Sequence, residues 1–343
     1  MNKKKNKKCI IIGFGRMGEQ YLKCLRSLNF SDIEIIDKSI KRLQIAKKKY
    51  NIKDENLSHF LYKKIYKKKY HIGIVSTTSD SHKTNVINLA KNRTKFIMVE
   101  KPVATSIKDA LEMQRVCKKF KSILGVNHQK RFTDEFNKLI KYQIKYKLGS
   151  LVSSNLVSAN IGLAMNGSHY IELFNFLTKN KINKVSAILE NRLVKGIRGK
   201  KFIDFAGKIS CYNSKNQSLI LNISSNQFHG LHIIQTFKMG SIFFDRMNGF
   251  ARLSSRKKNF FKFPSKFYGL PSRDLIFNFD KSDVFQSTKK SLEKLISNKN
   301  FIKSSEAIEV MKVIFAAVQS SSQNGKIVYL NNLKNLSKKI NWA

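Results

Sequence analysis

The chain has 343 residues, of which 66 are Lys or Arg and 22 are Asp or Glu, so its formal net charge is +44. Hydrophobic residues make up 42% of the chain, which is the content of a folded protein and excludes a disordered basic one. The length predicts two domains and excludes a small scaffold held by disulfides.

The charge at first suggests a nucleic-acid partner. Only 12 of the basic residues are Arg, the side chain that best reads bases, and the lysines are dispersed along the whole chain. We therefore expect the lysines to face water and expect no specific nucleic-acid partner. A site for nucleic acid or another polyanion is the alternative.

The cysteines have neither zinc spacing nor a disulfide pattern, because Cys9, Cys24, Cys117 and Cys211 lie far apart. This predicts no metal site and a reducing, cytoplasmic setting. The apolar run after the basic N-terminus ends at Arg16, too early for a signal peptide. The uncharged run 148–171 is rich in Ser, Asn and Gly, so no membrane helix is expected.

In the first third, short apolar runs alternate with helical patterns, which is typical of βαβ units and a parallel sheet. The runs predict strands at 9–13, 33–37, 72–76, 96–100 and 123–127. Helices are predicted at 17–29, 39–50, 82–92 and 106–119. Ser106 and Asp109 have the spacing of a helix start. A further helix over 133–148 is predicted to end at Gly149.

After Gly149, runs with β character follow one another at short intervals, which favours a mostly antiparallel sheet. They span 184–195, 202–213, 217–228, 231–238 and 241–245. Helical patterns follow at 284–297 and 306–319, before a last apolar run, 327–330. The prediction is an α/β chain: a doubly wound parallel domain over 1–127, then an α+β domain with a mostly antiparallel sheet over 128–343.

A glycine-rich turn directly follows the first predicted strand. It reads Gly13-Phe14-Gly15-Arg16-Met17-Gly18, and Asp37 ends the second strand 19 residues later. The glycines permit a tight turn, close approach of the backbone to a pyrophosphate and close packing of the next helix, while the aspartate can bind ribose hydroxyls. We expect a Rossmann dinucleotide-binding domain. A glycine-rich turn without a ligand is the alternative.

The residues around Asp37 bear on the choice of dinucleotide. A carboxylate here favours NAD, because it repels the additional phosphate of NADP. Lys38, Lys41 and Arg42 follow directly and could neutralise that phosphate. NAD is therefore the expected cofactor, with NADP as the alternative.

Two further segments close strands at the edge where such a sheet binds its ligand. Ser76 to His82 ends the third predicted strand, and Glu100-Lys101-Pro102 ends the fourth. With the glycine-rich turn, the Gly125 to Phe132 segment and the Gly167 to Leu173 segment, they resemble the glucose-fructose oxidoreductase, inositol dehydrogenase and MocA family over nearly the whole chain.

The resemblance implies an NAD(P)-dependent dehydrogenase or reductase for a CH–OH group of a sugar, cyclitol or sugar nucleotide. It makes Lys101 the residue that positions the reacting hydroxyl and His169 the general acid/base, a task that suits a group with a pKa near neutrality. It also implies a substrate-binding set, Asn127, Arg131 and Glu172, and a cofactor-binding set, Gly13 to Gly18, Asp37, Lys38, Arg42, Thr77, Thr78, His82, Glu100 and Lys101.

The chain departs from the family pattern beside His169. Met165 and Glu172 stand where the family has aspartates. Glu172 keeps a carboxylate, but Met165 cannot orient an imidazole, and the adjacent Asn166 carries no charge. A binding protein that senses cofactor or sugar without turnover is therefore the alternative function.

Several residues have structural alternatives. His82 can instead be a helix-cap group, and Arg131 can pair with Asp134 or Glu135. We interpret His128, His229 and His232 as structural. The aromatic stretch of Phe260, Phe261, Phe263, Phe267 and Tyr268 resembles a platform for single-stranded nucleic acid, but we expect it to cover the sheet or an oligomer contact. The second-domain sheet is expected to form a homo-oligomer.

Overall fold

The computed structural model of the protein describes residues 7–59, 68–190, 194–195, 201–228, 230–263, 272–280 and 283–342. The chain divides into two compact units. The first comprises Met1–Phe132, Asp283–Met311 and Asn335–Ala343, and the second comprises Thr133–Ser282 and Lys312–Lys334. The chain therefore passes into the second unit twice and ends in the first.

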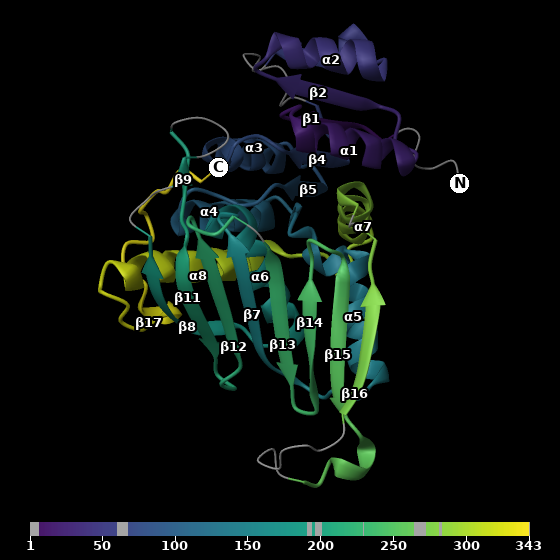
Figure 1. Cartoon of the computed structure of the whole chain (residues 1–343). Coiled ribbons are helices and arrows are strands. Elements are labelled where there is room, and N and C mark those ends of the chain that lie inside the picture. The colour runs from purple at the N-terminus through teal and green to yellow at the C-terminus, as the bar shows by residue number, and fades with distance from the viewer. Residues whose placement is uncertain are drawn as a thin grey trace. The chain divides into compact units, whose positions relative to one another are not determined.

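A six-stranded parallel sheet forms the centre of the first unit (Figure 1), which confirms the predicted doubly wound domain. Its order is β3-β2-β1-β4-β5-β6, so the direction of winding reverses between β1 and β4. The strands are β1 (Cys9–Ile12), β2 (Ile33–Asp37), β3 (Leu57–His59), β4 (Ile72–Val75), β5 (Phe96–Val99) and β6 (Ile123–Val126). The short edge strand β3 was not predicted, because one Leu followed by Ser and His does not make an apolar run.

Helices follow the strands at α1 (Arg16–Ser27), α2 (Ile40–Tyr50), α3 (Ser79–Lys91) and α4 (Ile107–Lys119). Ser106 caps α4 as predicted, because its hydroxyl accepts the Asp109 amide at 3.1 Å. Helix α3 begins three residues before the predicted start at 82. A later helix, α7 (Val284–Ile296), packs against α1, and its Leu292 and Leu295 join the apolar core of this sheet.

The second unit contains a nine-stranded sheet in the order β16-β15-β14-β13-β7-β12-β11-β8-β17. Neighbouring strands are antiparallel except β7 and β12, which are parallel, so the mostly antiparallel sheet is confirmed. The strands are β7 (Leu151–Ala159), β8 (Ile182–Leu189), β11 (Gly207–Asn213), β12 (Ser218–Ser224), β13 (Leu231–Phe237), β14 (Gly240–Asp245), β15 (Phe250–Arg256), β16 (Ser272–Asn278) and β17 (Val328–Tyr329).

Two predicted strands of this unit are interrupted. The run 184–195 breaks after Leu189, where β8 ends, and the carboxylate of the next residue, Glu190, accepts the Ser225 amide. The run 202–213 breaks at 205–206, and the strand resumes at Gly207, where φ is +144° and an added Cβ would lie 2.3 Å from the Ile188 carbonyl oxygen of β8. The pieces β9 (Val194–Lys195) and β10 (Ile203–Asp204) pair in a separate small sheet.

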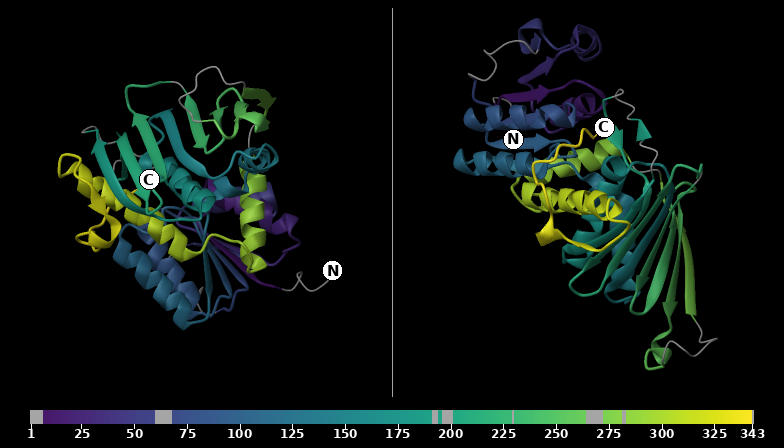
Figure 2. Two further views of the ribbon diagram at one scale, coloured as in Figure 1. Left: turned by 90° about the horizontal axis from the view of Figure 1, so that it is seen from below. Right: turned by 90° about the vertical axis from the view of Figure 1, so that its left-hand side faces the viewer.

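Helices α5 (Asp134–Lys145) and α6 (Ser168–Thr178) lie behind the sheet in Figure 1. Helix α5 ends before the predicted stop at Gly149, because Lys147 already adopts a left-handed φ of +52°. Helix α8 (Ser304–Ser321) comes later in the chain. Figure 2 shows the chain from below and from its left-hand side. Among the described residues, no helix has the length and apolarity that a bilayer crossing requires.

Candidate functional site

The glycine-rich turn joins β1 to α1 and is packed closely against the end of β4. A Cβ at Gly13, whose φ is +92°, would lie 2.9 Å from the carbonyl group of Ser76, and a Cβ at Gly18 would lie 2.2 Å from the Gly13 oxygen. The Ser76 hydroxyl donates to that oxygen at 2.7 Å. The turn therefore requires glycine at both places, and the first amides of α1 are available to an anion.

Asp37 is buried at the end of β2 and is bonded to this turn. Its Oδ2 accepts the Phe14 amide at 2.6 Å, and its Oδ1 accepts the Ser39 amide at 2.8 Å. A carboxylate has about four lone-pair sites, so two amides leave acceptor capacity for ribose hydroxyls. Asp37 was predicted from the sequence, and the structure brings it to the predicted turn.

Arg42 adds a positive charge beside Asp37. Its Nη1 lies 3.6 Å from Asp37 Oδ2, and its side chain is 51% exposed. The same nitrogen would lie 3.5 Å from a Cβ at Gly15. An exposed guanidinium over the turn can bind a phosphate group and can also shield the carboxylate that would repel one.

His82 connects two loops at the strand ends. Its Nε2 lies 3.0 Å from the Thr77 carbonyl oxygen, and its Nδ1 lies 3.0 Å from the Pro102 carbonyl oxygen. Burial is the main cause of a lowered pKa for this imidazole. The cap position of α3 is taken by Thr78, so the alternative interpretation of His82 as a cap group is wrong.

Glu100 is buried after β5 and accepts two hydrogen bonds at Oε1. Tyr21 donates its hydroxyl at 2.8 Å, and Asn127 donates its amide at 2.9 Å. These bonds fix the start of the Glu100-Lys101-Pro102 segment, in which the bond between Lys101 and Pro102 is cis. Because Asn127 follows β6, the carboxylate links the ends of two neighbouring strands.

His128 and Arg131 follow in the first unit. Burial, with the positive charges of Lys101 and Arg131, lowers the pKa of His128 to about 3. Arg131 pairs with Glu306 through Nη2 at 2.9 Å. Its proposed partner Glu135 pairs instead with Arg246 at 2.9 Å, because both belong to the second unit.

The C-terminal segment contacts the loop after Pro102 and the start of α3. The Trp342 side chain is fully buried, and its Nε1 donates to the Ala104 carbonyl oxygen at 2.9 Å. Its own carbonyl oxygen accepts the Ser79 hydroxyl at 3.0 Å. Trp342 therefore joins the loop after Pro102 to the start of α3. Trp342 was not predicted as a site residue, because nothing around it in the sequence indicates its partners.

In the second unit, the predicted His169 and Glu172 lie one turn apart on α6, and both are buried. A π-helical turn (Leu163–Gly167) leads into this helix and contains Met165. A carboxylate that the sequence did not indicate, Asp204 of β10, accepts the Met165 amide at 2.7 Å.

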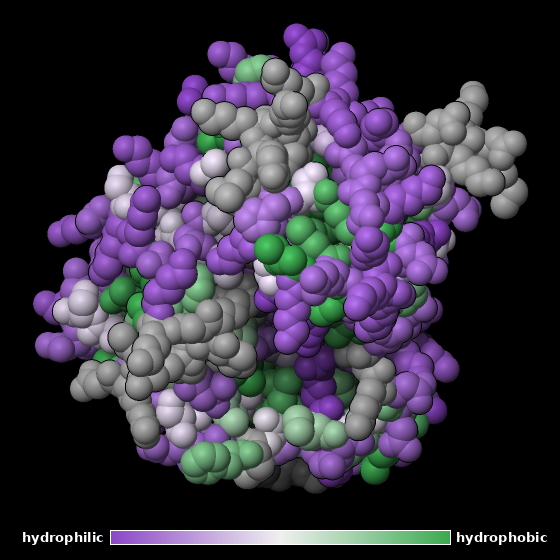
Figure 3. Space-filling view, turned by 90° about the horizontal axis from the view of Figure 1, so that it is seen from above, coloured by the Kyte–Doolittle hydropathy of each residue, from purple (hydrophilic) through white to green (hydrophobic). Residues whose placement is uncertain are grey.

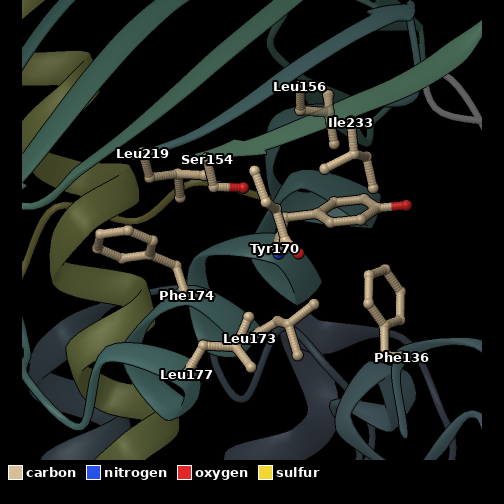
Figure 4. Close-up of a pocket in the computed structure, with 10 residues that line it drawn as sticks. Phe136, Ser154, Leu156, Tyr170, Leu173, Phe174, Leu177, Leu219 and Ile233 are labelled. Carbon is tan, nitrogen blue, oxygen red and sulfur yellow. The ribbon is translucent and has the colours of Figure 1, made fainter. Parts of the chain in front are cut away.

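A small hollow lies between α6 and the inner face of the sheet (Figure 4). It is lined by Phe136, Ser154, Leu156, Tyr170, Leu173, Phe174, Leu177, Leu219, Ile233 and Gln235. Most of these side chains are apolar, and neither His169 nor Glu172 is among them. The hollow is therefore part of the core behind α6 and is not the predicted substrate site.

The remaining candidates are surface or structural features. His232 lies 3.5 Å from Asp245 on the neighbouring strand. The Phe260 and Phe263 rings are 5.8 Å apart, while Phe267, Tyr268 and His229 lie outside the described residues. In the space-filling view hydrophilic side chains cover most of the visible face, as the lysine content predicts (Figure 3).

The chain matches the model of an oxidoreductase family with an NAD-binding Rossmann fold over residues 7–128. A search of curated proteins found no match. Similar solved structures include an oxidoreductase from Agrobacterium radiobacter in complex with NAD+, L-tartaric acid and magnesium. Its TM-score is 0.76 at 15% identity, over 95% of this chain and 98% of that one.

Two other similar structures are a dehydrogenase and a repressor. Apo scyllo-inositol dehydrogenase from Lactobacillus casei has a TM-score of 0.72 at 14% identity, over 96% of this chain and 99% of that one. The super-repressor mutant of Gal80p from Saccharomyces cerevisiae has a TM-score of 0.74 at 10% identity, over 95% of this chain and 98% of that one. At these identities the likeness establishes the shared fold.

Proposed function

We propose that the chain transfers a hydride between a nicotinamide cofactor and a carbon of its substrate. The match of residues 7–128 to the model of an oxidoreductase family with an NAD-binding Rossmann fold supports this proposal. The substrate we propose is a secondary alcohol or ketone of a sugar, cyclitol or sugar nucleotide. In this proposal residues 1–127 bind the dinucleotide, and residues 128–343 supply substrate binding and oligomer contacts.

The hydrogen bond from the Phe14 amide to Asp37 is the observation that carries the cofactor assignment. It holds a buried carboxylate beside the glycine-rich turn, where the first amides of α1 can bind a pyrophosphate. We propose NAD as the cofactor, with NADP accepted through Arg42. The bound nicotinamide supplies the hydride acceptor or donor.

The protein's own groups would handle the proton. In the proposal Lys101 donates a hydrogen bond to the reacting hydroxyl, and His169 takes its proton as the hydride leaves. Asn127, Arg131 and Glu172 complete the proposed substrate-binding set. The hydrogen bonds of Glu100 to Tyr21 and Asn127 support the part assigned to Lys101, because they fix the loop from which it extends.

A homo-oligomer through the second-unit sheet is also part of the proposal. The described central strands β7, β12, β13 and β14 contain no Lys or Arg, although these residues are frequent elsewhere in the chain. A row across the outer face runs through Ile220, Asn155, Ile234 and Phe243. An uncharged face in a lysine-rich chain supports burial against a second copy. The four buried free thiols support a cytoplasmic location.

A sensor without turnover is the second candidate function. The shared fold with the Gal80p super-repressor mutant favours it, as does Met165 at the turn before His169. Such a protein would bind the dinucleotide through the same turn and would not change its oxidation state.

Turnover across a substrate panel tests the proposal and separates the two candidates. The chain is mixed with NAD+ or NADP+ and with sugars, inositols and sugar nucleotides, and reduced nicotinamide is followed by absorbance. We expect one substrate class to be oxidised, and Lys101→Ala to lower kcat about a hundredfold or more. Lys95→Ala, at the opposite end of β5, is the matched control. Cofactor binding without turnover on any panel member would support the sensor.

A further inference from the structure

The C-terminal segment, residues 335–342, belongs to the first unit and follows the connection between β5 and α4. Two backbone hydrogen bonds fasten it there. The Leu336 carbonyl oxygen accepts the Lys108 amide at 2.9 Å, and the Ile340 amide donates to the Thr105 carbonyl oxygen at 2.9 Å. The segment is therefore fixed to this connection before it reaches Trp342.

Trp342 then bonds two different loops at once. Its indole Nε1 donates to the Ala104 carbonyl oxygen at 2.9 Å, and its own carbonyl oxygen accepts the Ser79 hydroxyl at 3.0 Å. The exposed fraction is 0% for Trp342, 1% for Ala104 and 3% for Ser79. Because water does not reach these groups, neither bond can be replaced by one to solvent. Trp342 thus spans the loop after β4 and the loop after β5.

The same two loops carry residues of the proposed cofactor-binding set. Thr77 and Thr78 directly precede Ser79, and Lys101 lies three residues before Ala104. Strands β4 and β5 are parallel neighbours, so both loops leave the sheet at its carboxyl edge, where such a fold binds its ligand. The bonds of Trp342 therefore act within three residues of the proposed cofactor ligands.

His82 is the other connection between these loops, and it is the weaker one. Its two ring nitrogens face the carbonyl oxygens of Thr77 and Pro102 at 3.0 Å each. Burial lowers the pKa of this imidazole, so it is neutral and has a single N–H. It can donate to only one of the two oxygens at a time, whereas Trp342 makes a hydrogen bond to each loop.

We propose that Trp342 is a positioning residue for the dinucleotide. The assignment rests on the cofactor binding proposed above. Trp342 acts through Ser79 and Ala104, and its two bonds hold the loop after β4 and the loop after β5 at the spacing that the cofactor requires. Because the cofactor and Trp342 act on the same loops, each should stabilise the bound state of the other by the same factor.

Calorimetric titration with NADH measures this coupling. Trp342→Phe removes the indole donor and keeps the carbonyl oxygen that Ser79 binds, while Ser79→Ala removes the other bond. We expect each variant to raise the Kd for NADH about fivefold, because each frees one loop. The double variant should raise the Kd by less than the product of the two effects, since the loss of one bond already releases the spacing.

Tyr70→Phe is the matched control for a loss of stability. It removes a buried hydroxyl that donates to Glu34 at 2.7 Å, in the same unit but before the start of β4, at the opposite edge of the sheet. It should lower the unfolding midpoint and leave the Kd for NADH unchanged. An unchanged Kd in Trp342→Phe, or an equal rise in Tyr70→Phe, would mean that Trp342 only stabilises the fold and would overturn the proposal.

Fluorescence tests the coupling from the other side. The chain has a single Trp, so its emission reports Trp342 alone. In Ser79→Ala we expect the acrylamide quenching constant to rise about twofold, because the segment opens more often. Saturating NAD+ should bring the constant back toward the native value. A quenching constant that NAD+ leaves unchanged in Ser79→Ala would overturn the proposal.

These measurements do not depend on turnover. If Trp342→Phe weakens NADH binding and no substrate is oxidised by the native chain, the proposed hydride transfer fails and this inference stands. If substrates are oxidised and Trp342→Phe binds NADH as the native chain does, the proposed function stands and this inference fails. A native chain that binds neither dinucleotide would overturn both.

Discussion

The backbone amide of Phe14 donates to Oδ2 of Asp37 over 2.6 Å, although 23 positions separate the two residues. The bond connects the glycine-rich turn after β1 with the end of β2. It therefore sets the distance between the amides that would bind a pyrophosphate and the carboxylate that would bind a ribose.

Removing the Asp37 carboxylate should weaken dinucleotide binding. We expect Asp37→Ala to raise the Kd for NADH about tenfold or more, because hydrogen bonds to a charged acceptor are lost and the Phe14 amide loses its partner. Calorimetric titration measures the change. Asp32→Ala, at the opposite end of β2, should bind NADH as the native chain does. An equal loss of NADH affinity in Asp37→Ala and Asp32→Ala would contradict the account.

Arg42 should discriminate between the two dinucleotides. We expect Arg42→Ala to raise the Kd for NADPH about tenfold and to change the Kd for NADH little, because the guanidinium can bind a 2′-phosphate that NADH lacks. Lys48→Ala, in the last turn of α2, is the charge control. Equal affinity changes for NADH and NADPH would show that Arg42 does not select the cofactor.

Trp342 should stabilise the first unit. Trp342→Phe removes the indole N–H that binds Ala104 and leaves a smaller ring in a buried site, so we expect a loss of about 2 kcal/mol in the free energy of unfolding. Urea unfolding followed by circular dichroism measures it. Leu111→Ala, at a side chain that is 40% exposed, should cost less than about 1 kcal/mol. An unchanged midpoint for Trp342→Phe would mean that the C-terminal segment does not hold these loops.

The stability of the first unit should fall in mild acid because of His128. The pKa of His128 is lowered to about 3 in the folded chain, against about 6.5 in the unfolded chain. Between pH 3 and pH 6.5 the unfolded state therefore binds a proton at this residue and the folded state does not. The free energy of unfolding should decrease by about 1.4 kcal/mol for each pH unit below 6.5 from this group.

His128→Gln should remove this contribution to the dependence of the free energy of unfolding on pH. His59→Gln, at a partly exposed histidine of β3, should leave that dependence unchanged. Urea midpoints measured by Trp fluorescence at several pH values give both slopes, because the chain has a single Trp and it lies in the first unit. A His128→Gln slope equal to the native slope would be the contrary result.

Much of the first unit could be predicted from the sequence. Buried parallel strands such as β1 and β2 appear as continuous Ile-rich runs, and glycine spacing marks the turn between β1 and α1. The bond from Phe14 to Asp37 then follows from the order of strands in the sheet. By contrast, α7 could not be assigned to this unit, because its place depends on tertiary packing of Leu292 and Leu295.

The second unit was harder to predict. Strand β7 mixes apolar residues with Ser and Asn without a regular alternation. Its parallel pairing with β12 depends on contacts across the sheet. Asp204 was missed because its partners, Ala164 and Met165, lie about 40 positions earlier and contribute backbone amides, which leave no mark in the sequence. The presence of His169 on a helix beside Glu172 could be anticipated, but not the carboxylate at the helix entrance.

Calorimetric titration of the native chain with NADH, and separately with NADPH, tests the central claim most directly. The account predicts saturable binding of NADH at one site per chain, which Asp37→Ala weakens and Asp32→Ala does not. A folded chain that binds neither dinucleotide would contradict it, because the turn at Gly13 and the carboxylate of Asp37 would then have no ligand.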